Sequence, residues 1–285
     1  QNSFGQNASL LGQYRFNQLA VQAESQYQYI NGAQRQVGGF TTRNIVLNDL
    51  RFIYDWSEKT TFDLELSQDS FIYDSPYNSS YYFQATAGID YLILPKTRVG
   101  LEGTAGYVTA ENNPAQTYQM VNARFKYDLT SKIALKATGG VQFNQYVSGD
   151  QSMRVSPVWS LGGEYLPFPN TAISLITYRN LQVSPSLNNQ DFWATGVELG
   201  ITQTIAQKFQ VGLAGGYEND TYVANEKNVD ADRVDNFFFI QPEISYNFLR
   251  YLTATVFYQH RFNDSTEQFD TWYDNQVGLE LSAAF

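Results

Sequence analysis

The stretch "YFQATAGIDYLI", residues 82–93, decides the fold class, because apolar and polar side chains alternate along most of its length. In an extended strand, successive side chains point to opposite faces, so residues two apart share a face. One face of this segment is therefore apolar, and the other carries mainly amide, hydroxyl and carboxylate groups. The apolar set is Phe83, Ala85, Ala87, Ile89 and Tyr91. This pattern predicts a β-strand that separates an apolar phase from water.

The same alternation recurs along the whole chain, for example in "LAVQAESQYQY" (19–29), "IALKATGGVQF" (133–143) and "FFFIQPEISYNF" (237–248). A tilted strand of about 9–11 residues is long enough to cross a bilayer. The predicted strands cover residues 4–16, 19–31, 40–56, 60–73, 80–94, 97–110, 117–129, 133–147, 154–167, 171–183, 191–205, 209–218, 236–249, 252–262 and 271–285.

The connections between these segments alternate between short turns and longer loops. Short polar turns are expected near 17–18, 57–59, 95–96, 131–132, 169–170, 207–208 and 250. Longer loops are expected near 32–39, 74–79, 110–116, 148–153, 184–190, 219–235 and 263–270. Tight turns on one rim and larger loops on the other are typical of outer-membrane barrels. We therefore predict an all-β fold, a transmembrane up-and-down antiparallel β-barrel in the outer membrane of a Gram-negative-type bacterium.

The number of predicted strands is odd, whereas single-chain bacterial barrels have even numbers. We expect about sixteen strands, with the first one upstream of Gln1, and fourteen is the alternative. Residues 1–285 are expected to form a single barrel domain that lacks this upstream strand.

The composition agrees with a molecule that has one aromatic face and one uncharged polar face. Aromatic residues make up 16% of the chain, charged residues also only 16%, and there is no cysteine. No run of eighteen apolar residues occurs, so the sequence encodes no transmembrane helix. The net charge of −10 argues against nucleic acid as a partner. The expected partner is the lipid bilayer.

Aromatic residues of the apolar face gather next to the short turns. Tyr and Trp rings prefer the headgroup zone of a membrane, where they form a girdle. Phe285 ends the amphipathic segment "VGLELSAAF" and resembles the signal read by the outer-membrane insertion machinery, which we expect as a second partner. The predicted girdle consists of Tyr14, Phe16, Tyr54, Trp56, Tyr91, Tyr127, Tyr165, Tyr246, Phe248 and Phe285.

Charged residues are expected to line the lumen, because charges in lipid are costly. A barrel of about sixteen strands can leave an aqueous channel. The alternative is that these residues pair across a plugged lumen. The predicted lumen-lining residues are Arg15, Glu24, Arg51, Glu65, Arg98, Glu102, Arg124, Lys126, Lys136, Glu164, Arg179, Glu198, Glu243, Arg261 and Glu280.

Little in the sequence points to catalysis or to a metal. His260, the only histidine, falls on the apolar face of "FYQHRFN". A Ser-His-Asp site would need His260 to turn inward, so we expect that the protein is not an enzyme. One His without Cys builds no ordinary transition-metal site, and we expect no metal and no cofactor. The acidic segment "ENDTYVANEKNVDADRVD" (218–235) lacks the order of a calcium hand, so we expect a solvated loop, with weak divalent-cation binding as the alternative.

The second half of the chain resembles the outer-membrane family called β-barrel porin type 2. The resemblance lies in "LGGEYLPFPNTAISLITYRNLQVSPSL" (161–187), "VGLAGGYENDTY" (211–222), "RVDNFFFIQPEISYNFLRYLTATVFYQHRFNDS" (233–265) and "DNQVGLELSAAF" (274–285). Arg179 and Arg233 stand where this family tends to carry Arg, whereas the front end is shorter than in the family. The resemblance implies an outer-membrane protein, frequently linked with export of extracellular polysaccharide.

Three hypotheses about function follow. The first is a porin-like channel or translocation conduit with saccharide as cargo, suggested by Tyr82, Phe237 and Phe239 beside amide groups on the polar face. The second is a non-conducting structural barrel that anchors or docks a partner protein. The third, which we favour least, is an embedded hydrolase that uses His260.

Overall fold

The computed structural model describes residues 3–147, 153–225 and 229–284, most of which lie in β-strands. The strands are Phe4–Phe16 (β1), Leu19–Gln34 (β2), Gly39–Asp55 (β3), Thr60–Tyr73 (β4), Ser80–Leu94 (β5), Thr97–Ala110 (β6), Asn113–Thr130 (β7), Ile133–Tyr146 (β8), Arg154–Phe168 (β9), Thr171–Val183 (β10), Gln190–Ile205 (β11), Phe209–Ala224 (β12), Val234–Leu249 (β13), Leu252–Ser265 (β14) and Trp272–Ala283 (β15). One 3-10 helix, Gln268–Asp270 (η1), precedes β15. Within these ranges, no helix is long and apolar enough to span a bilayer.

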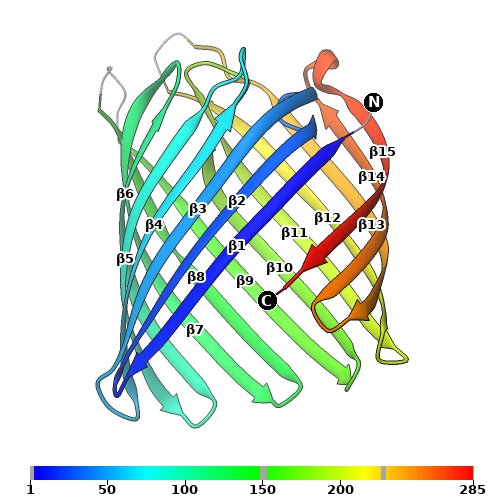
Figure 1. Ribbon diagram of the computed structural model, residues 1–285. Helices are drawn as coiled ribbons and strands as arrows, with labels where there is room; N and C mark the ends of the chain where they lie inside the picture. The colour runs from blue at the N-terminus through cyan, green and yellow to red at the C-terminus, as the bar shows by residue number, and fades with distance from the viewer. Residues whose placement is uncertain (1–2, 148–152, 226–228, 285) are drawn as a thin grey trace.

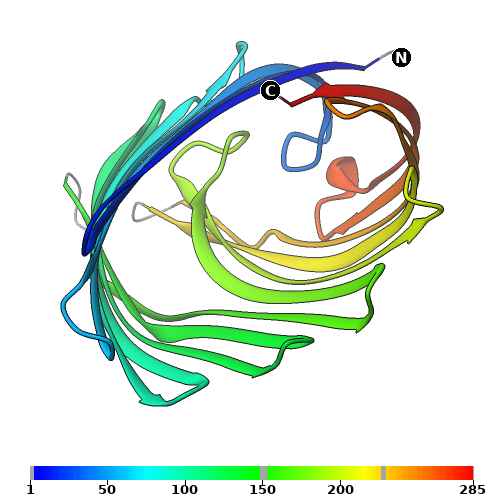
Figure 2. The same cartoon turned by 60° about the horizontal axis from the view of Figure 1, so that its bottom comes forward.

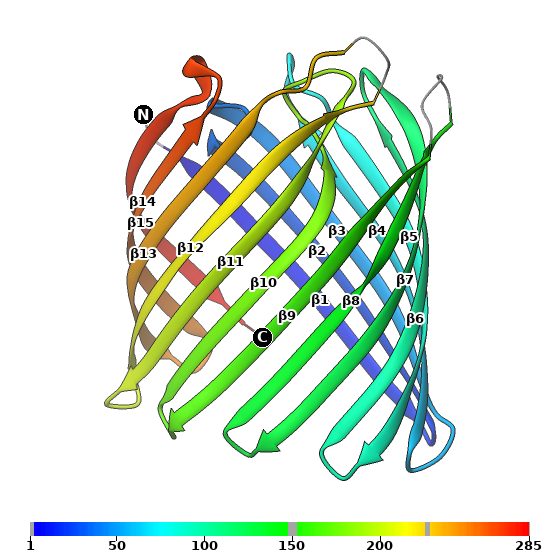
Figure 3. The same cartoon turned by 180° about the vertical axis from the view of Figure 1, so that it is seen from behind.

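All fifteen strands form one sheet in which each strand pairs with its neighbours in the sequence. Every ladder between consecutive strands is antiparallel, from β1–β2 to β14–β15. The sheet curls into a ring of tilted strands (Figures 1 and 3). Each internal strand pairs on both sides, so its backbone groups are satisfied within the sheet, as an apolar environment requires. The predicted all-β, up-and-down fold is confirmed.

The two faces of the sheet differ in chemistry as the alternation predicts. On the concave face, Arg124 of β7 reaches Asp63 of β4, three strands away, at 2.6 Å. On the convex face, large apolar side chains remain uncovered: Leu101 is 61% exposed and Val121 is 58% exposed. A soluble protein rarely exposes apolar patches of this extent, so the convex face is the one that contacts lipid.

The connections separate into two rims (Figure 3). The short-turn rim holds the connections 17–18, 56–59, 95–96, 131–132, 169–170, 206–208 and 250–251. The long-loop rim holds the connections 35–38, 74–79, 111–112, 184–189 and 266–271, and the segments that follow β8 and β12 lie partly outside the described residues. Asn17 and Asn112 take positive φ values of 47° and 54°, which Asn tolerates well and which let the chain reverse within two residues.

Two predicted loops are shorter than expected. The loop expected at 110–116 is only the turn 111–112, because Asn112 adopts the left-handed conformation and β7 starts at Asn113. The loop expected at 219–235 begins only after Ala224, because β12 continues to pair with both β11 and β13 beyond Glu218. The sheet therefore projects further at this rim than the apolar pattern alone indicates.

The ring is not closed by a backbone ladder among the described residues, because the sheet order ends at β1 and β15. An odd number of consecutive antiparallel strands makes β1 and β15 run in the same direction, as Figure 1 shows. They therefore cannot pair antiparallel with each other. A side-chain bond from Gln276 Nε2 to Ser3 Oγ, 2.7 Å long, joins the two edges. The fourteen-strand alternative is wrong, and a sixteenth strand upstream of Gln1 stays a prediction, as does the single-domain boundary.

Candidate functional site

Fourteen of the fifteen residues predicted to line the lumen share the concave face. The cross-strand register carries this face from β1 to β15 without a change of side, for example through the pairs Arg51↔Glu65 and Arg98↔Lys126. The fourteen residues are Arg15, Glu24, Arg51, Glu65, Arg98, Glu102, Arg124, Lys126, Lys136, Glu164, Glu198, Glu243, Arg261 and Glu280. Their role in lining a conduit stays a prediction.

Arg179 does not lie on the lumen face, and its prediction is wrong. On β10 it is five residues from Ser174, which pairs with Glu164 of the concave face, so the two side chains point to opposite sides. Arg179 instead donates to Thr195 Oγ1 at 2.7 Å and lies over the ring of Trp193 at 4.9 Å. A guanidinium on the convex face is stabilised there by cation–π contact in place of water.

Nine residues of the predicted girdle lie beside the short-turn rim, and Phe285 falls outside the described residues. Several of the rings contact one another, with 4.3 Å between the ring centroids of Tyr14 and Phe16 and 5.9 Å between those of Tyr246 and Phe248. Edge-to-face and tilted contacts of this kind add to the burial of the rings. Their function as an interfacial belt stays a prediction.

A four-residue charge cluster lies on the lumen face nearer the short-turn rim. Arg124 contacts Asp63 at 2.6 Å, Asp90 at 3.0 Å and Glu102 at 3.5 Å. The Asp63 side chain is only 5% exposed, so this guanidinium compensates a carboxylate that has little access to water. The cluster ties β4, β5, β6 and β7 together through side chains as well as through the backbone ladder.

The end of the β10–β11 hairpin folds inside the ring (Figure 2). The β9–β10 ladder ends at the pair Arg179↔Trp159, whereas the β10–β11 ladder continues to Val183↔Asp191. The hairpin thus leaves the wall while its own two strands stay paired. The sequence analysis expected a loop at 184–190 but gave no indication that it turns inward.

Connection 184–189 contacts three other connections of the long-loop rim. Ser186 Oγ donates to the carbonyl oxygen of Gln36 at 2.7 Å. The backbone N–H of Asn78 donates to the carbonyl oxygen of Pro185 at 2.8 Å. Asn189 donates in the same way to Asn112 at 3.3 Å. The hairpin is therefore held across the long-loop end of the lumen rather than extended into solvent.

A buried polar network fixes the base of this hairpin. Asp191 is fully buried and accepts bonds from Gln116 (3.2 Å), Tyr146 (3.1 Å) and Asn225 (2.9 Å). Arg154 also donates to the Tyr146 hydroxyl at 3.2 Å and to the carbonyl oxygen of residue 224 at 2.8 Å. Buried polar groups that are satisfied in this way specify one arrangement of the surrounding chain.

Charged residues of both signs form a second network at the long-loop rim. Arg35 pairs with Glu218, and its contact with Asp220 is 2.7 Å long. The contact joins the connection after β2 to β12, two strands that are not neighbours in the sheet. Arg35 also lies 4.7 Å above the ring of Phe237.

Arg233 and Asp270 belong to the same rim network. Arg233 contacts Asp235 at 2.6 Å and Asp270 at 2.9 Å. Burial alone lowers the pKa of Arg233, but bonding to Asp235 and the nearby carboxylates raises it above its ordinary value. Burial raises the pKa of Asp270, and the Arg233 charge only partly offsets this rise. No local sequence pattern predicts these pairings. The sequence indicates only that Arg233 stands where the β-barrel porin type 2 family tends to carry Arg.

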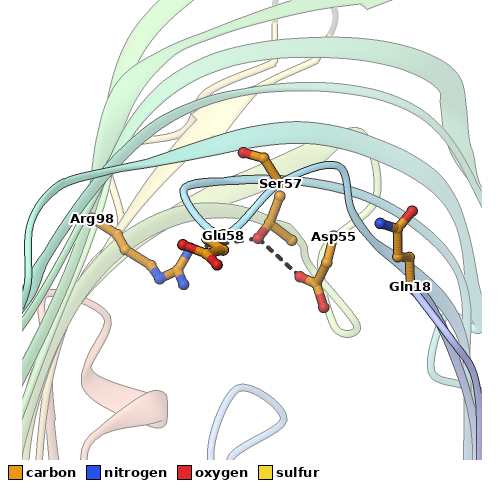
Figure 4. Close-up of a pocket in the computed structure, with 6 residues that line it drawn as sticks. Gln18, Asp55, Ser57, Glu58 and Arg98 are labelled. Atoms are coloured by element: carbon orange, nitrogen blue, oxygen red, sulfur yellow. Dashed lines mark hydrogen bonds between the residues drawn. The ribbon is translucent and has the colours of Figure 1, made fainter.

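A pocket of about 620 Å³ opens at the short-turn rim. Figure 4 shows that its labelled side chains come from the turns 17–18 and 56–59 and from β3 and β6. Thr61 donates to Asp55 at 3.1 Å and accepts a long bond from Arg98 at 3.4 Å. The lining is mixed in charge: Gln18, Asp55, Ser57, Glu58, Thr61 and Arg98.

His260 lies on the convex face, as predicted, because it pairs with Ile240. Its Nδ1 is 2.8 Å from Asn275 Oδ1, which also accepts a bond from Tyr258. In the described ranges, no group of three or more Asp, Glu or His side chains is close enough to hold a metal ion. Glu226 of the acidic segment lies outside those ranges.

No protein-family model matches the chain, and no curated protein sequence matches it. Similarity appears among solved structures. The FrpB iron transporter from Neisseria meningitidis (F3-3 variant) aligns with 99% of this chain at a TM-score of 0.56 and 9% identity. The copper transporter OprC aligns with 97% of this chain at a TM-score of 0.50 and 8% identity. The chain spans 57% and 58% of the length of these two transporters, and identities this low show a shared fold alone.

The expectation that the protein is not an enzyme does not stand. The structural neighbours also include OmpT, an outer membrane protein of Vibrio cholerae, at 11% identity and a TM-score of 0.43 over 99% of this chain and 95% of that one. Likeness of fold at identities this low shows nothing about catalysis, so enzyme status is not established and we withdraw the expectation.

The architecture and the surface lead to one conclusion. The sheet has the antiparallel topology of outer-membrane barrels, and its convex face presents exposed apolar side chains to the surroundings. Fourteen of the fifteen charged residues predicted to line the lumen lie on the concave face, away from lipid, where charges are costly. The chain is an outer-membrane β-barrel protein of the Gram-negative type.

Proposed function

We propose that the protein is a porin-like conduit for saccharides, narrowed at the long-loop rim by the β10–β11 hairpin. The observation that carries the proposal is the polar lumen face, which continues over all fifteen strands and combines charges with amides and aromatic rings. Tyr118 on this face donates to Gln84 at 2.8 Å, and Phe237 lies 6.1 Å from Phe239. Rings suit the apolar faces of sugars, and amides suit their hydroxyls.

Extracellular polysaccharide is the cargo we favour, on the resemblance of residues 155–285 to the β-barrel porin type 2 family. Membership of that family is part of this proposal. The metal-transport activity named for the two structural neighbours does not extend to this chain at 8–9% identity.

Single-channel recording in planar bilayers tests the proposal. We expect the wild-type protein to conduct, and we expect removal of residues 185–188, with a Gly-Gly link, to increase the conductance, because these residues cross the lumen. Deletion of one residue in the turn 206–208, at the opposite rim, serves as the control and should leave conductance unchanged. Added oligosaccharide should interrupt the current. Absence of conductance in both the wild type and the loop deletion would refute the conduit.

A second candidate is a non-conducting barrel that anchors a partner protein. The observation in its favour is the set of contacts that holds connection 184–189 across the lumen, above all the bond from Ser186 to Gln36. This candidate predicts that neither the wild type nor the deletion of residues 185–188 conducts, and that a stoichiometric partner protein co-purifies from membranes. Conductance of the loop deletion alone would instead identify a closed conduit.

A further inference from the structure

Three cationic side chains lie side by side on the lumen face near the short-turn rim. Arg98 of β6 is directly opposite Lys126 of β7, and Lys126 is directly opposite Lys136 of β8. All three point into the lumen. We call Arg98, Lys126 and Lys136 the cation row.

Directly opposed like charges destabilise a sheet, so this arrangement is unfavourable unless something neutralises it. Within the described residues, no carboxylate oxygen lies within 4.0 Å of these three head groups. Among the described residues, the side chains of the row make one hydrogen bond, from Arg98 to Thr61 at 3.4 Å. Lys126 and Lys136 are exposed, so a solute in the lumen can reach them.

Of the lumen-facing carboxylates near the row, Asp128 and Glu164 lie further than 4.0 Å from its three head groups, and three others are already engaged. Asp63, Asp90 and Glu102 all contact Arg124, which lies one lumen-facing position above Lys126 on β7. Elsewhere the protein does compensate facing charges of one sign: Asp220 opposes Asp235 in the β12–β13 ladder, and Arg35 and Arg233 neutralise them. The cation row has no such compensation.

We propose that the cation row is a binding site for anionic groups, and that its ligand is the carboxylate, sulfate or phosphate of an acidic saccharide. Neighbouring strands are about 4.8 Å apart, so the three head groups offer charges at a spacing that suits a flexible chain with repeated anions. The saccharide part of this assignment rests on the proposed function, whereas the anion site itself does not.

The site is tested by calorimetric titration of the detergent-solubilised protein with three probes. The probes are an oligogalacturonate, a maltooligosaccharide of the same length and sodium sulfate. We expect the oligogalacturonate to bind, the neutral maltooligosaccharide not to bind, and sulfate to bind at least tenfold more weakly. Binding should weaken as salt is added, because the attraction is screened.

Two variants with the same change in net charge locate the site. The double variant Lys126→Gln/Lys136→Gln should weaken oligogalacturonate binding at least tenfold. The matched double variant Lys96→Gln/Lys132→Gln alters turn lysines that instead donate to the carbonyl oxygens of Leu129 and Pro167, and it should bind as the wild type does. The row variant should fold at least as well as the wild type, because it removes like-charge repulsion.

The outcomes separate the site from the conduit. Failure of the wild type to bind oligogalacturonate, or equal weakening by both double variants, would overturn the site. Sulfate binding as tight as that of oligogalacturonate would overturn the saccharide assignment. Normal binding by a barrel that never conducts would support the site while refuting the conduit.

Discussion

Replacement of Arg124 by Met tests whether the charge cluster of the lumen wall stabilises the barrel. The change keeps most of the side-chain length but leaves Asp63, Asp90 and Glu102 without their shared cation. Removing one partner of a buried ion pair costs about 3–5 kcal/mol. Asp63 is 5% exposed but Asp90 is 28% exposed, so lumen water relieves part of the charge, and we expect a loss near the lower limit, about 3 kcal/mol.

The comparison variant is Arg15→Met. Arg15 pairs with Asp55 at 2.5 Å, but their side chains are 65% and 38% exposed. Exposed ion pairs contribute about 0–1 kcal/mol, so this variant should lose less than about 1 kcal/mol. Arg124 and Arg15 both pair with carboxylates on the lumen face. The two sites differ mainly in how far the side chains are buried.

The assay is reversible urea unfolding in lipid vesicles, followed by tryptophan fluorescence and by the heat-dependent mobility of the folded barrel on gels. The double variant Arg124→Met/Asp63→Asn should recover part of the loss, because it removes the least exposed of the three carboxylates, which without Arg124 keeps only a 3.9 Å contact with Arg51. Equal losses for Arg124→Met and Arg15→Met would show that burial of the cluster does not set its energetic value, and would refute the reasoning.

Two further predictions concern the faces and the long-loop rim. Leu101→Lys on the convex face should cost about 2–4 kcal/mol of stability, whereas Leu11→Lys on the lumen face, where it meets Glu24 across β1–β2, should cost far less. Equal losses in urea unfolding would contradict the assignment of the faces. The raised pKa of Asp270 means that the folded state binds its proton more tightly than the unfolded state, so ionisation of Asp270 reduces stability as the pH rises through the folded pKa. Asp270→Asn, which can still bond to Arg233, should therefore be more stable than the wild type at pH 8 but not at pH 3, and a difference independent of pH would contradict this.

The sequence alone determined the strands, the two rims and the lumen face, because each follows from local rules. Side chains alternate in any extended strand, so counting by two from one apolar residue places Glu65 and Glu243 on the lumen face without knowledge of their partners. Arg179 was misplaced because it was assigned by charge rather than by that count. Lipid on one face and water on the other make the alternation strict in a barrel.

The tertiary structure alone decided what lies inside the ring. Nothing in the segment around Pro185 indicates that it turns inward, because its partners Gln36 and Asn78 are more than a hundred positions away and come near only when the sheet curls. The cation row is similar: the parity of Lys126 and Lys136 follows from the sequence, but their direct opposition depends on the register of the β7–β8 hairpin, which its turn sets. Periodicity fixes the side to which a residue points, whereas contacts between distant residues depend on how the whole sheet curls.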